Sequence, residues 1–497
     1  MRSFEQNFIR YINASFPILY IDTFEDDKAK KIIHELCQQN GRNVIEWNLS
    51  EAYDYSTEPP LSIPKADLAT TLKLLTDDGN LNNKVLLAQE AHFSLDNPEN
   101  ISALKFIAKK ILSGEFNFNI CLVSPLVPLP KELENYTTIM ELDSLTADDI
   151  KKIIVDFSEM QYIDLPEKDL LDKLVTRLKG LSQIEIDNIL SLAVSEDGML
   201  TYSDLPLVLE QKQQMVRKSG ILEMIHVKES MDDIGGLENL KKWLLRKAEI
   251  FKQIKKAQDF GVDIPKGVLI AGMPGCGKSL TAKAAAKAFD VPLLRLDMGR
   301  LMGKYVGESE GNMRRAIKLT EASSPCVLWI DELEKAFAGI GGGGSEVTTR
   351  LFGSFLTWMQ EKDSLAFVVA TANKIDALPP ELLRKGRFDE TFFVNLPNKS
   401  ERRKILEIHI GKRRKSDLKN IDLDKLVEKT DGYCGADLEG IVREGIESAF
   451  VNKEETLETN HILEAIESTH SLSEVMKDSI GEMIKTYEKL KLKSASK

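Results

Sequence analysis

Short apolar runs alternate with amphipathic segments along the first 125 residues of the chain. Residues 4–15 carry apolar side chains at helical spacing, with Phe4, Phe8 and Ile12 on one face, and residues 28–39 repeat that pattern. Four apolar runs predict buried strands, at 17–21, 43–48, 84–90 and 119–124. Because these strands alternate with helices, we expect a parallel α/β sheet here.

The same alternation returns in the second half of the chain and then gives way to helices. Apolar runs at 267–271, 325–330 and 366–372 predict strands. Beyond residue 398 the spacing is helical, and it predicts helices at 400–412, 423–429, 436–450, 459–467 and 472–492. The patterns predict a first α/β domain at 1–203, a linker helix at 204–228, a second α/β domain at 229–398, and a helical lid with an extension at 399–497.

One glycine-rich stretch lies between a predicted strand and a predicted helix. Gly272-Met273-Pro274-Gly275-Cys276-Gly277-Lys278-Ser279 fits the phosphate-loop pattern G-x-x-x-x-G-K-[ST] at every fixed position. A loop in this setting binds a polyphosphate such as that of ATP, because backbone N–H groups and the helix N-terminus both point at the anion. We expect Lys278 to contact the β- and γ-phosphates and Ser279 to coordinate Mg²⁺.

Two of the predicted strands end in polar residues that suit phosphate chemistry. The run at 325–330 is followed by Asp331 and Glu332, and the run at 366–372 by Asn373. Nucleotide crevices lie at the carboxyl ends of parallel strands. We expect Asp331 to hold Mg²⁺, Glu332 to polarise the attacking water, and Asn373 to hydrogen-bond the γ-phosphate or that water. The alternative for Asn373 is a strand cap.

Two further motifs fit the same chemistry. Arg384 and Arg387 are candidates for the guanidinium groups that neutralise charge on a transferring phosphoryl group, although they could be a surface cation pair. Gly235 and Gly236, upstream of the phosphate loop, would let the backbone approach an adenine edge closely.

The first α/β domain repeats the plan of the second with its chemical groups replaced. The loop after its first strand, residues 22–27, contains four acids and no glycine, so it would repel a phosphate. Its third strand ends at Glu90 where the second domain has Glu332, and residues 179–189 echo residues 431–441. We predict a degenerate copy that does not bind ATP. The alternative is an unrelated α/β domain with similar spacing.

Composition narrows the classes of partner. The net charge of −12, from 66 basic and 78 acidic residues, argues against broad binding to nucleic acid or to anionic membranes. No apolar run approaches the 18 residues of a membrane span. Five cysteines without a C-x-x-C pair are typical of a reducing compartment, so we expect a cytoplasmic protein.

Residues 229–450 resemble the AAA domain of the classical AAA ATPases. The matching stretches are Asp233–Gly236, Gly272–Ser279, Tyr305–Glu310, Asp331-Glu332, Asn373, Arg384 with Arg387, and Gly435–Asp437. The whole chain, N-terminal half included, resembles an AAA protein encoded in algal plastid genomes and in many bacteria. The resemblance implies hydrolysis of ATP with Mg²⁺, a P-loop α/β module with a helical lid, and a homo-oligomer, which in that family is a hexameric ring.

The resemblance also implies roles for single residues. Arg384 and Arg387 would be arginine fingers that act on the ATP of the neighbouring subunit. Lys304, Tyr305 and Val306 would form the pore loop that grips a polypeptide. Residues 339–345 would form a second pore-facing loop, or a plain flexible loop. The implied nucleotide-binding set is Gly235, Gly272, Pro274, Gly275, Cys276, Gly277, Lys278, Ser279, Leu280, His409, Gly435 and Ala436.

Two functions follow as hypotheses. In the first, an ATP-driven ring remodels or threads a protein substrate. In the second, the protein is a scaffold or assembly factor in which ATP only switches oligomerisation and partner binding. A nucleic-acid motor is disfavoured by the net charge.

Cys276 raises a separate question because it lies inside the phosphate loop, at a helix N-terminus and close to Lys278. Both features lower the pKa of a thiol and favour the reactive thiolate. We therefore expect a redox-sensitive ATPase, whereas the alternative is a small side chain that fills a permissive position.

Overall fold

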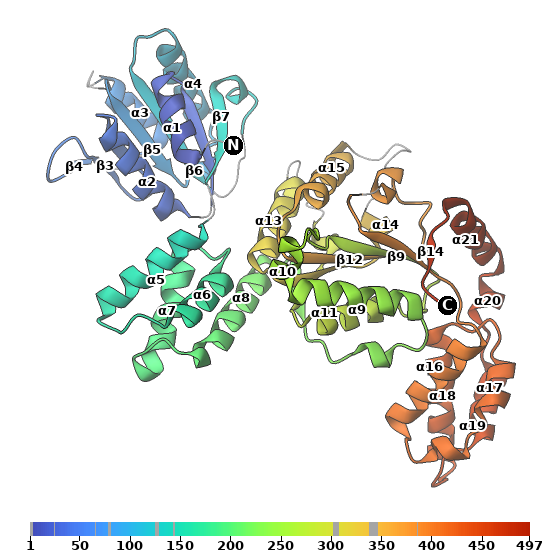
Figure 1. The fold of residues 1–497 in the computed structure, drawn as a ribbon. Helices are drawn as coiled ribbons and strands as arrows, with labels where there is room; N and C mark the ends of the chain where they lie inside the picture. The colour runs from blue at the N-terminus through green and yellow to red at the C-terminus, as the bar shows by residue number, and fades with distance from the viewer. Residues whose placement is uncertain are drawn as a thin grey trace. The chain divides into compact units, whose positions relative to one another are not determined.

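The computed structural model describes residues 3–497 except 24, 65, 78–80, 125–128, 143–144, 302–307, 337–345 and 385. The chain folds into two compact units, Met1–Leu205 and Pro206–Lys497, each with its own seven-stranded sheet. Figure 1 shows the elements of both units.

The N-terminal unit is an α/β sheet followed by a small helical bundle. Its strands are β1 (Ile18–Asp22), β2 (Asn43–Trp47), β3 (Ala52–Asp54), β4 (Leu61–Ile63), β5 (Lys84–Gln89), β6 (Phe118–Ser124) and β7 (Thr137–Glu141). One face is covered by α1 (Phe4–Asn13) and α2 (Asp26–Gln39), and the other by α3 (Leu68–Asp77) and α4 (Pro98–Leu112). The bundle contains α5 (Ala147–Gln161), α6 (Lys168–Leu178) and α7 (Gln183–Asp197).

The sheet of the C-terminal unit carries the phosphate loop. Its strands are β8 (Leu222–Ile225), β9 (Gly267–Gly272), β10 (Leu293–Leu296), β11 (Cys326–Ile330), β12 (Ala366–Ala372), β13 (Glu390–Val394) and β14 (Lys493–Ser494). The helices before the lid are α8 (Leu205–Ser219), α9 (Glu238–Lys252), α10 (Ile254–Asp259), α11 (Lys278–Phe289), α12 (Met298–Leu301), α13 (Glu308–Ala322), α14 (Leu333–Ala336) and α15 (Glu346–Glu361). The sheet lies between α9 and α11 on one side and α13 and α15 on the other (Figure 1).

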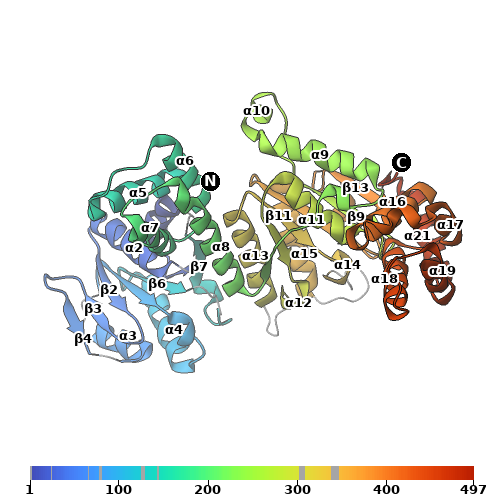
Figure 2. The same cartoon turned by 90° about the horizontal axis from the view of Figure 1, so that it is seen from below.

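A lid of helices follows the last strand of the parallel core. It contains α16 (Lys399–Arg413), α17 (Leu423–Lys429), α18 (Gly435–Val451) and α19 (Thr459–Ser468). After the lid come α20 (Leu472–Val475) and α21 (Lys477–Leu490), and Figure 2 shows the lid helices and α21 gathered at one end of this unit. Among the described residues no helix combines the length and apolar character that a membrane span requires.

The two sheets share one topology. Five parallel strands run in the order β7-β1-β6-β5-β2 in the N-terminal unit and β13-β9-β12-β11-β10 in the C-terminal unit. In both units the first strand along the chain lies between the fourth and the fifth. The predicted fold class is therefore confirmed, and the shared order supports the predicted repeat.

Local backbone geometry repeats as well. Glu90 and Glu332, which follow equivalent strands, both have left-handed backbone, with φ of 56° and 51°. The first turn of α7 is held by a carboxylate, because the backbone N–H of Gln183 donates to Glu25 Oε1 at 3.2 Å. The first turn of α18 is held by the phosphate loop, because the N–H of Ala436 donates to the carbonyl of Gly275 at 2.9 Å.

Two predicted boundaries differ from the structure. The linker predicted at 204–228 is not helical throughout, because β8 lies within it and pairs antiparallel with β10. Its helix was predicted to end near Ser219-Gly220, and it does end at Ser219, where Gly220 takes left-handed backbone with φ 67°. The helix predicted at 472–492 is broken at Met476, where φ of −121° and ψ of 30° leave the helical range.

Candidate active site

A cavity of about 460 Å³ lies at the carboxyl ends of β9, β11 and β12, where the lid meets the sheet. Its volume falls in the usual range for ligand pockets. Every residue predicted to bind nucleotide lines it except Gly272. Asp331, Glu332 and Asn373, predicted to be catalytic, line it as well. The structure therefore brings together predicted residues from six separate stretches of sequence.

The phosphate loop needs its glycines for two physical reasons. Gly275 and Gly277 have left-handed backbone, with φ of 69° and 86°, which glycine adopts without strain. Gly272 packs so closely on β13 that a Cβ would lie 2.0 Å from the carbonyl oxygen of Val394. The backbone can therefore fold around a polyphosphate only with glycine at these positions.

Lys278 is buried in the loop, with 6% of its surface exposed. Its ammonium donates to the carbonyls of Gly272 at 2.9 Å and Met273 at 2.7 Å. Burial lowers the pKa of Lys278 to about 8, although nearby carboxylates oppose that shift. A polyphosphate beside this ammonium would supply the negative charge that a buried cation requires.

Asp331 is held by two hydroxyl groups. Thr371 donates to Asp331 Oδ1 at 2.5 Å, and Ser279 donates to the same oxygen at 3.3 Å. A hydroxyl and a carboxylate are hard oxygen ligands of the kind that Mg²⁺ prefers, and Mg²⁺ takes its other ligands from substrate phosphates and water. Ser279 and Asp331 therefore fit the predicted Mg²⁺ site.

Glu332 lies in a network with residues at the end of the neighbouring strand β12. The backbone of Glu332 is left-handed, and its N–H donates to Thr371 Oγ1 at 3.1 Å. Asn373 Nδ2 donates to Glu332 Oε1 at 3.2 Å. Lys335, one turn on, pairs with Glu332 Oε2 at 2.6 Å. The buried carboxylate of Glu334 accepts the backbone N–H of Asn373 at 3.0 Å. The carboxylate and the amide therefore have defined positions beside the phosphate loop.

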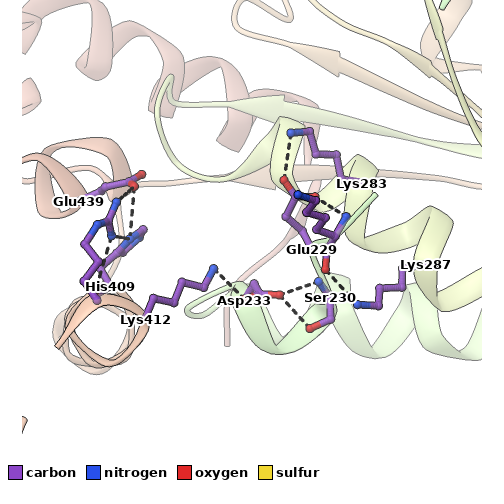
Figure 3. Close-up of polar contacts among 10 residues, drawn as sticks. Glu229, Ser230, Asp233, Lys283, Lys287, His409, Lys412 and Glu439 are labelled. Atoms are coloured by element: carbon purple, nitrogen blue, oxygen red, sulfur yellow. Dashed lines mark hydrogen bonds and ion pairs between the residues drawn. The ribbon is translucent and has the colours of Figure 1, made fainter. Parts of the chain in front are cut away.

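Ion pairs join the rim of the cavity to the lid (Figure 3). Lys412 on α16 pairs with Asp233 Oδ1 at 2.7 Å. This contact, together with the backbone and hydroxyl of Ser230, lowers the pKa of Asp233 to about 2. On the other side of Ser230, Glu229 pairs with Lys283 of α11 at 3.1 Å. The segment 229–233 thus bridges the helix of the phosphate loop and the first lid helix.

His409 lines the cavity from the same face of α16 as Lys412 (Figure 3). Its Nδ1 lies 3.7 Å from Glu439 Oε1, and Arg413 pairs with the same oxygen at 2.7 Å. Burial lowers the pKa of His409, so its imidazole is neutral near pH 7. A neutral imidazole both donates and accepts hydrogen bonds, which suits a ribose hydroxyl.

Gly235 and Gly236 have a second partner that the sequence did not reveal. A Cβ on Gly235 would lie 2.5 Å from Ile405, and one on Gly236 would lie 2.5 Å from Glu401 Oε1. Glu401 also accepts the N–H of Leu237 at 3.0 Å. The glycines therefore allow close approach of the lid helix α16, in addition to any approach of an adenine.

Arg384 and Arg387 do not line the cavity of their own chain. Arg384 is exposed at the end of a short 3₁₀ helix, and Arg387 is half-buried and donates to the carbonyl of Glu381. Lys304, Tyr305 and Val306, predicted to form the pore loop, lie outside the described residues, and so does the stretch 339–345.

The expectation of a reactive Cys276 was wrong in its physical basis. Burial raises the pKa of the Cys276 thiol to about 12, because the side chain packs between the phosphate loop and the start of α18. Lys278 lowers the pKa of the thiol as expected, and so does a hydrogen bond with the backbone of Gly435, but desolvation has the larger effect. The thiol is therefore protonated at neutral pH and largely shielded from solvent.

Sequence reasoning missed Thr371 and Lys412. Thr371 is the one polar residue in the apolar run 366–372, and that interruption was the available signal. Lys412 stands among several basic residues of α16, and nothing in the sequence distinguishes it from its neighbours. Only the fold brings it to Asp233.

Comparison with known proteins agrees with this site. Residues 268–396 match the family described as "ATPase family associated with various cellular activities (AAA)", and residues 420–464 match "AAA+ lid domain". Residues 4–142 match "SpoVK-like AAA ATPase, N-terminal domain", and residues 148–219 match the second domain of that same group.

Relatives cover the chain almost end to end. The "Uncharacterized AAA domain-containing protein ycf46" of Guillardia theta is 36% identical over 97% of this chain and 94% of its own length. That of Pyropia yezoensis is 35% identical over 91% of each. A "Cell division cycle protein 48 homolog" of Archaeoglobus fulgidus is 32% identical over 50% of this chain and 34% of its own length. The chain is therefore an AAA ATPase and belongs to the family of AAA domain-containing ycf46 proteins.

Proposed function

We propose that this ATPase works as a homo-oligomer in which each subunit completes the active site of its neighbour. The observation that carries the proposal is the position of Arg384 and Arg387 outside the cavity that Lys278, Asp331 and Glu332 line. An interface that joins two different surfaces closes into a ring when its rotation permits. The resemblance to AAA ATPases supports six subunits.

In the proposed reaction Lys278 holds the β- and γ-phosphates while Glu332 takes a proton from the attacking water. Asn373 positions that water and the γ-phosphate, and the arginines of the neighbour neutralise the charge that develops on the phosphoryl group. Ser279 and Asp331 would hold Mg²⁺, which would supply positive charge to offset that of the phosphates. Glu332 and Asn373 are 3.2 Å apart, so both can contact one water molecule.

Mixing of complementary variants tests the shared site. Arg384→Ala and Arg387→Ala should each reduce hydrolysis strongly and change ATP affinity less. A mixture of the Arg384→Ala chain with a Lys278→Ala chain should recover part of the activity, because intact half-sites then meet at an interface. Absence of recovery, under conditions where labelled subunits demonstrably exchange, would contradict action in trans.

We further propose that the oligomer remodels or threads a protein substrate in the cytoplasm. The likeness of Lys304, Tyr305 and Val306 to an AAA pore loop supports this role, and five buried free thiols fit a reducing compartment. ATP turnover should rise with an unfolded polypeptide, and that rise should disappear in Tyr305→Ala. Partner binding that depends on nucleotide but is unaffected by Tyr305→Ala would favour the scaffold instead.

A further inference from the structure

The segment Ser471–Ser496, here called the strap, connects the lid to the sheet a second time. The first connection is the direct chain from β13 to α16. The strap contains α20, α21 and β14, and Figure 1 shows α20 beside the lid helices and α21 beside β14 at the edge of the sheet. One end of the strap contacts the turn of the lid beside the phosphate loop, and the other end contacts the edge of the sheet beside the loop that carries Arg384 and Arg387.

The first end of the strap is fixed to the turn of the lid that touches the phosphate loop. The N–H of Leu472 donates to Asp437 Oδ2 at 3.2 Å, and the same oxygen accepts the N–H of Cys434 at 2.8 Å to begin α18. The N–H of Ser473 donates to the carbonyl of Gly432 at 3.3 Å. A Cβ on Gly432 would lie 2.0 Å from Ser473 Oγ, so this contact is close.

The middle of the strap belongs to the core of the sheet. Ile480, Met483 and Ile484 of α21 pack in the hydrophobic cluster that also contains residues of α9 and β13. The ring of Tyr487 stacks on that of Phe393, with centroids 4.3 Å apart and planes 16° apart. Because protein cores are close-packed, α21 cannot shift without disturbing β13.

The last part of the strap pairs with the edge of the sheet and buries Ala495 there. β14 pairs in parallel with β13, and the N–H of Ala495 donates to the carbonyl of Phe393 at 2.9 Å. Ala495 is fully buried, and its carbonyl accepts the N–H groups of Asn239 and Leu240 at 3.0 and 3.1 Å. The Asn239 side chain donates to the carbonyls of Ser494 and Ser496.

This end of the strap adjoins the loop that carries the two arginines. β13 begins at Glu390, three residues after Arg387, and Lys493 of β14 pairs with Glu390. Residues from 383–391 and from 490–493 line a common cavity of about 1260 Å³. The arginine loop therefore has space beside it, and the strap forms part of the boundary of that space.

We propose that the strap carries the position of the lid to the arginine loop of the same subunit. Lid residues Gly435, Ala436 and His409 line the nucleotide cavity, so bound nucleotide shifts the balance of lid positions. The strap is anchored at both ends and packed between them, which is the kind of contiguous element that carries such coupling. Nucleotide bound in the pocket of one subunit thus determines the position of the arginines that this subunit contributes to the site of its neighbour. The proposal rests on the trans role of Arg384 and Arg387.

Hydrogen exchange tests the coupling within one subunit. The monitored chain carries Arg384→Ala and Arg387→Ala, so its arginines cannot respond to a neighbour's nucleotide. A non-hydrolysable ATP analogue should change the exchange rate of residues 381–394 by roughly threefold or more. Adding Ala495→Arg, which overfills the buried socket, should abolish that response. The control Ser494→Arg places the same side chain one residue earlier, at an exposed position, and should preserve it.

Complementary mixtures test the functional consequence. Here the chain that supplies the arginines carries Glu332→Gln, so it still binds ATP but does not hydrolyse it. Ala495→Arg in that chain should reduce the turnover recovered in mixtures with the Arg384→Ala, Arg387→Ala chain, and the KM for ATP should not change. Ala495→Arg should have little effect on the recovered turnover when it is placed in the chain that supplies the pocket. If the strap only stabilised the lid, the opposite pattern would result. Ala495→Arg would then lower turnover and raise the KM for ATP when it is placed in the chain that supplies the pocket.

The outcomes separate the two proposals. An unchanged exchange response in Ala495→Arg, or none in the parent chain, overturns the coupling. No recovery in the mixture without a strap substitution overturns the trans arginines, while the exchange result still decides the coupling. If thermal melting shows that Ala495→Arg does not fold, Asn239→Ala replaces it, because it removes only the side-chain bonds to Ser494 and Ser496.

Discussion

Lys278 and Glu332 line the same cavity but have different expected roles. Lys278 is buried among carbonyl groups and would meet phosphate directly, whereas Glu332 is placed beside Asn373 and would act on water. Glu332→Gln should therefore keep ATP binding and lose turnover by about 10²- to 10⁴-fold. Lys278→Ala should lose both, as measured by calorimetry and phosphate release.

The N-terminal unit supplies a matched control for that experiment. Glu90 has the same left-handed backbone at the end of the equivalent strand. Glu90→Gln should leave turnover within twofold of the parent protein, about the limit of 0.5 kcal/mol expected for a neutral change. If Glu332→Gln hydrolysed ATP normally, the glutamate would have to be removed from the mechanism.

The pKa of Lys278 predicts how ATP affinity depends on pH. ATP favours the protonated ammonium, and in the free protein that form is lost as pH rises through about 8. Affinity should be constant well below pH 8 and fall above it, by up to about tenfold per pH unit. Calorimetric titration between pH 6.5 and 9.5 would measure the slope, and a flat profile would show that Lys278 stays charged throughout.

Single residues could be predicted from the sequence where a motif fixes the backbone conformation. They could not be predicted where burial determines the pKa of a side chain. Gly275, Gly277 and Lys278 follow from the phosphate-loop pattern because the backbone can make that turn in few ways. The pKa of Cys276 could not be read from its neighbours in sequence, since the desolvation comes from the start of α18, more than 150 residues later in the numbering.

At the scale of elements, the ion pair between Asp233 and Lys412 joins segment 229–233 to α16, so an opening of the lid would break it. Lys412→Ala should speed dissociation of ADP by roughly two- to fivefold, the range expected for a partly exposed ion pair. Lys412→Arg should preserve the parent rate. Stopped-flow displacement of a fluorescent ADP analogue would measure it.

A charge exchange provides the control for that pair. The double variant Asp233→Lys with Lys412→Asp should dissociate ADP more slowly than either single variant, because the attraction is restored in reverse. High salt should reduce the difference between parent and Lys412→Ala. Additive effects of the two single changes would show that the residues do not act on the lid together.

The long elements were predictable and the short ones were not. The central strands of both sheets are apolar runs, and the periodicity of residues 399–468 correctly indicated four lid helices. β8 and β14 are edge strands of four and two residues, and tertiary contacts with β10 and β13 define them. The break at Met476 likewise has no signal in the local pattern of the sequence.

At the scale of the whole molecule, the chain contains two modules of one topology but one phosphate loop. We therefore predict one ATP per chain. The acids of residues 22–27 occupy the place of the glycines, and charge repulsion at that place opposes a second polyphosphate. Calorimetry on the Glu332→Gln protein should give a stoichiometry near one, and a value near two would contradict the degenerate copy.

The contact between Glu25 and Gln183 has a consequence for how the two units would respond to nucleotide. In the C-terminal unit the matching helix, α18, is hydrogen-bonded to the phosphate loop itself, so filling of that loop would act directly on the helix. In the N-terminal unit a carboxylate of the chain itself makes the matching contact, so no diffusible ligand is needed to hold α7. We therefore expect the concentration of ATP to alter α18 and to leave α7 unchanged.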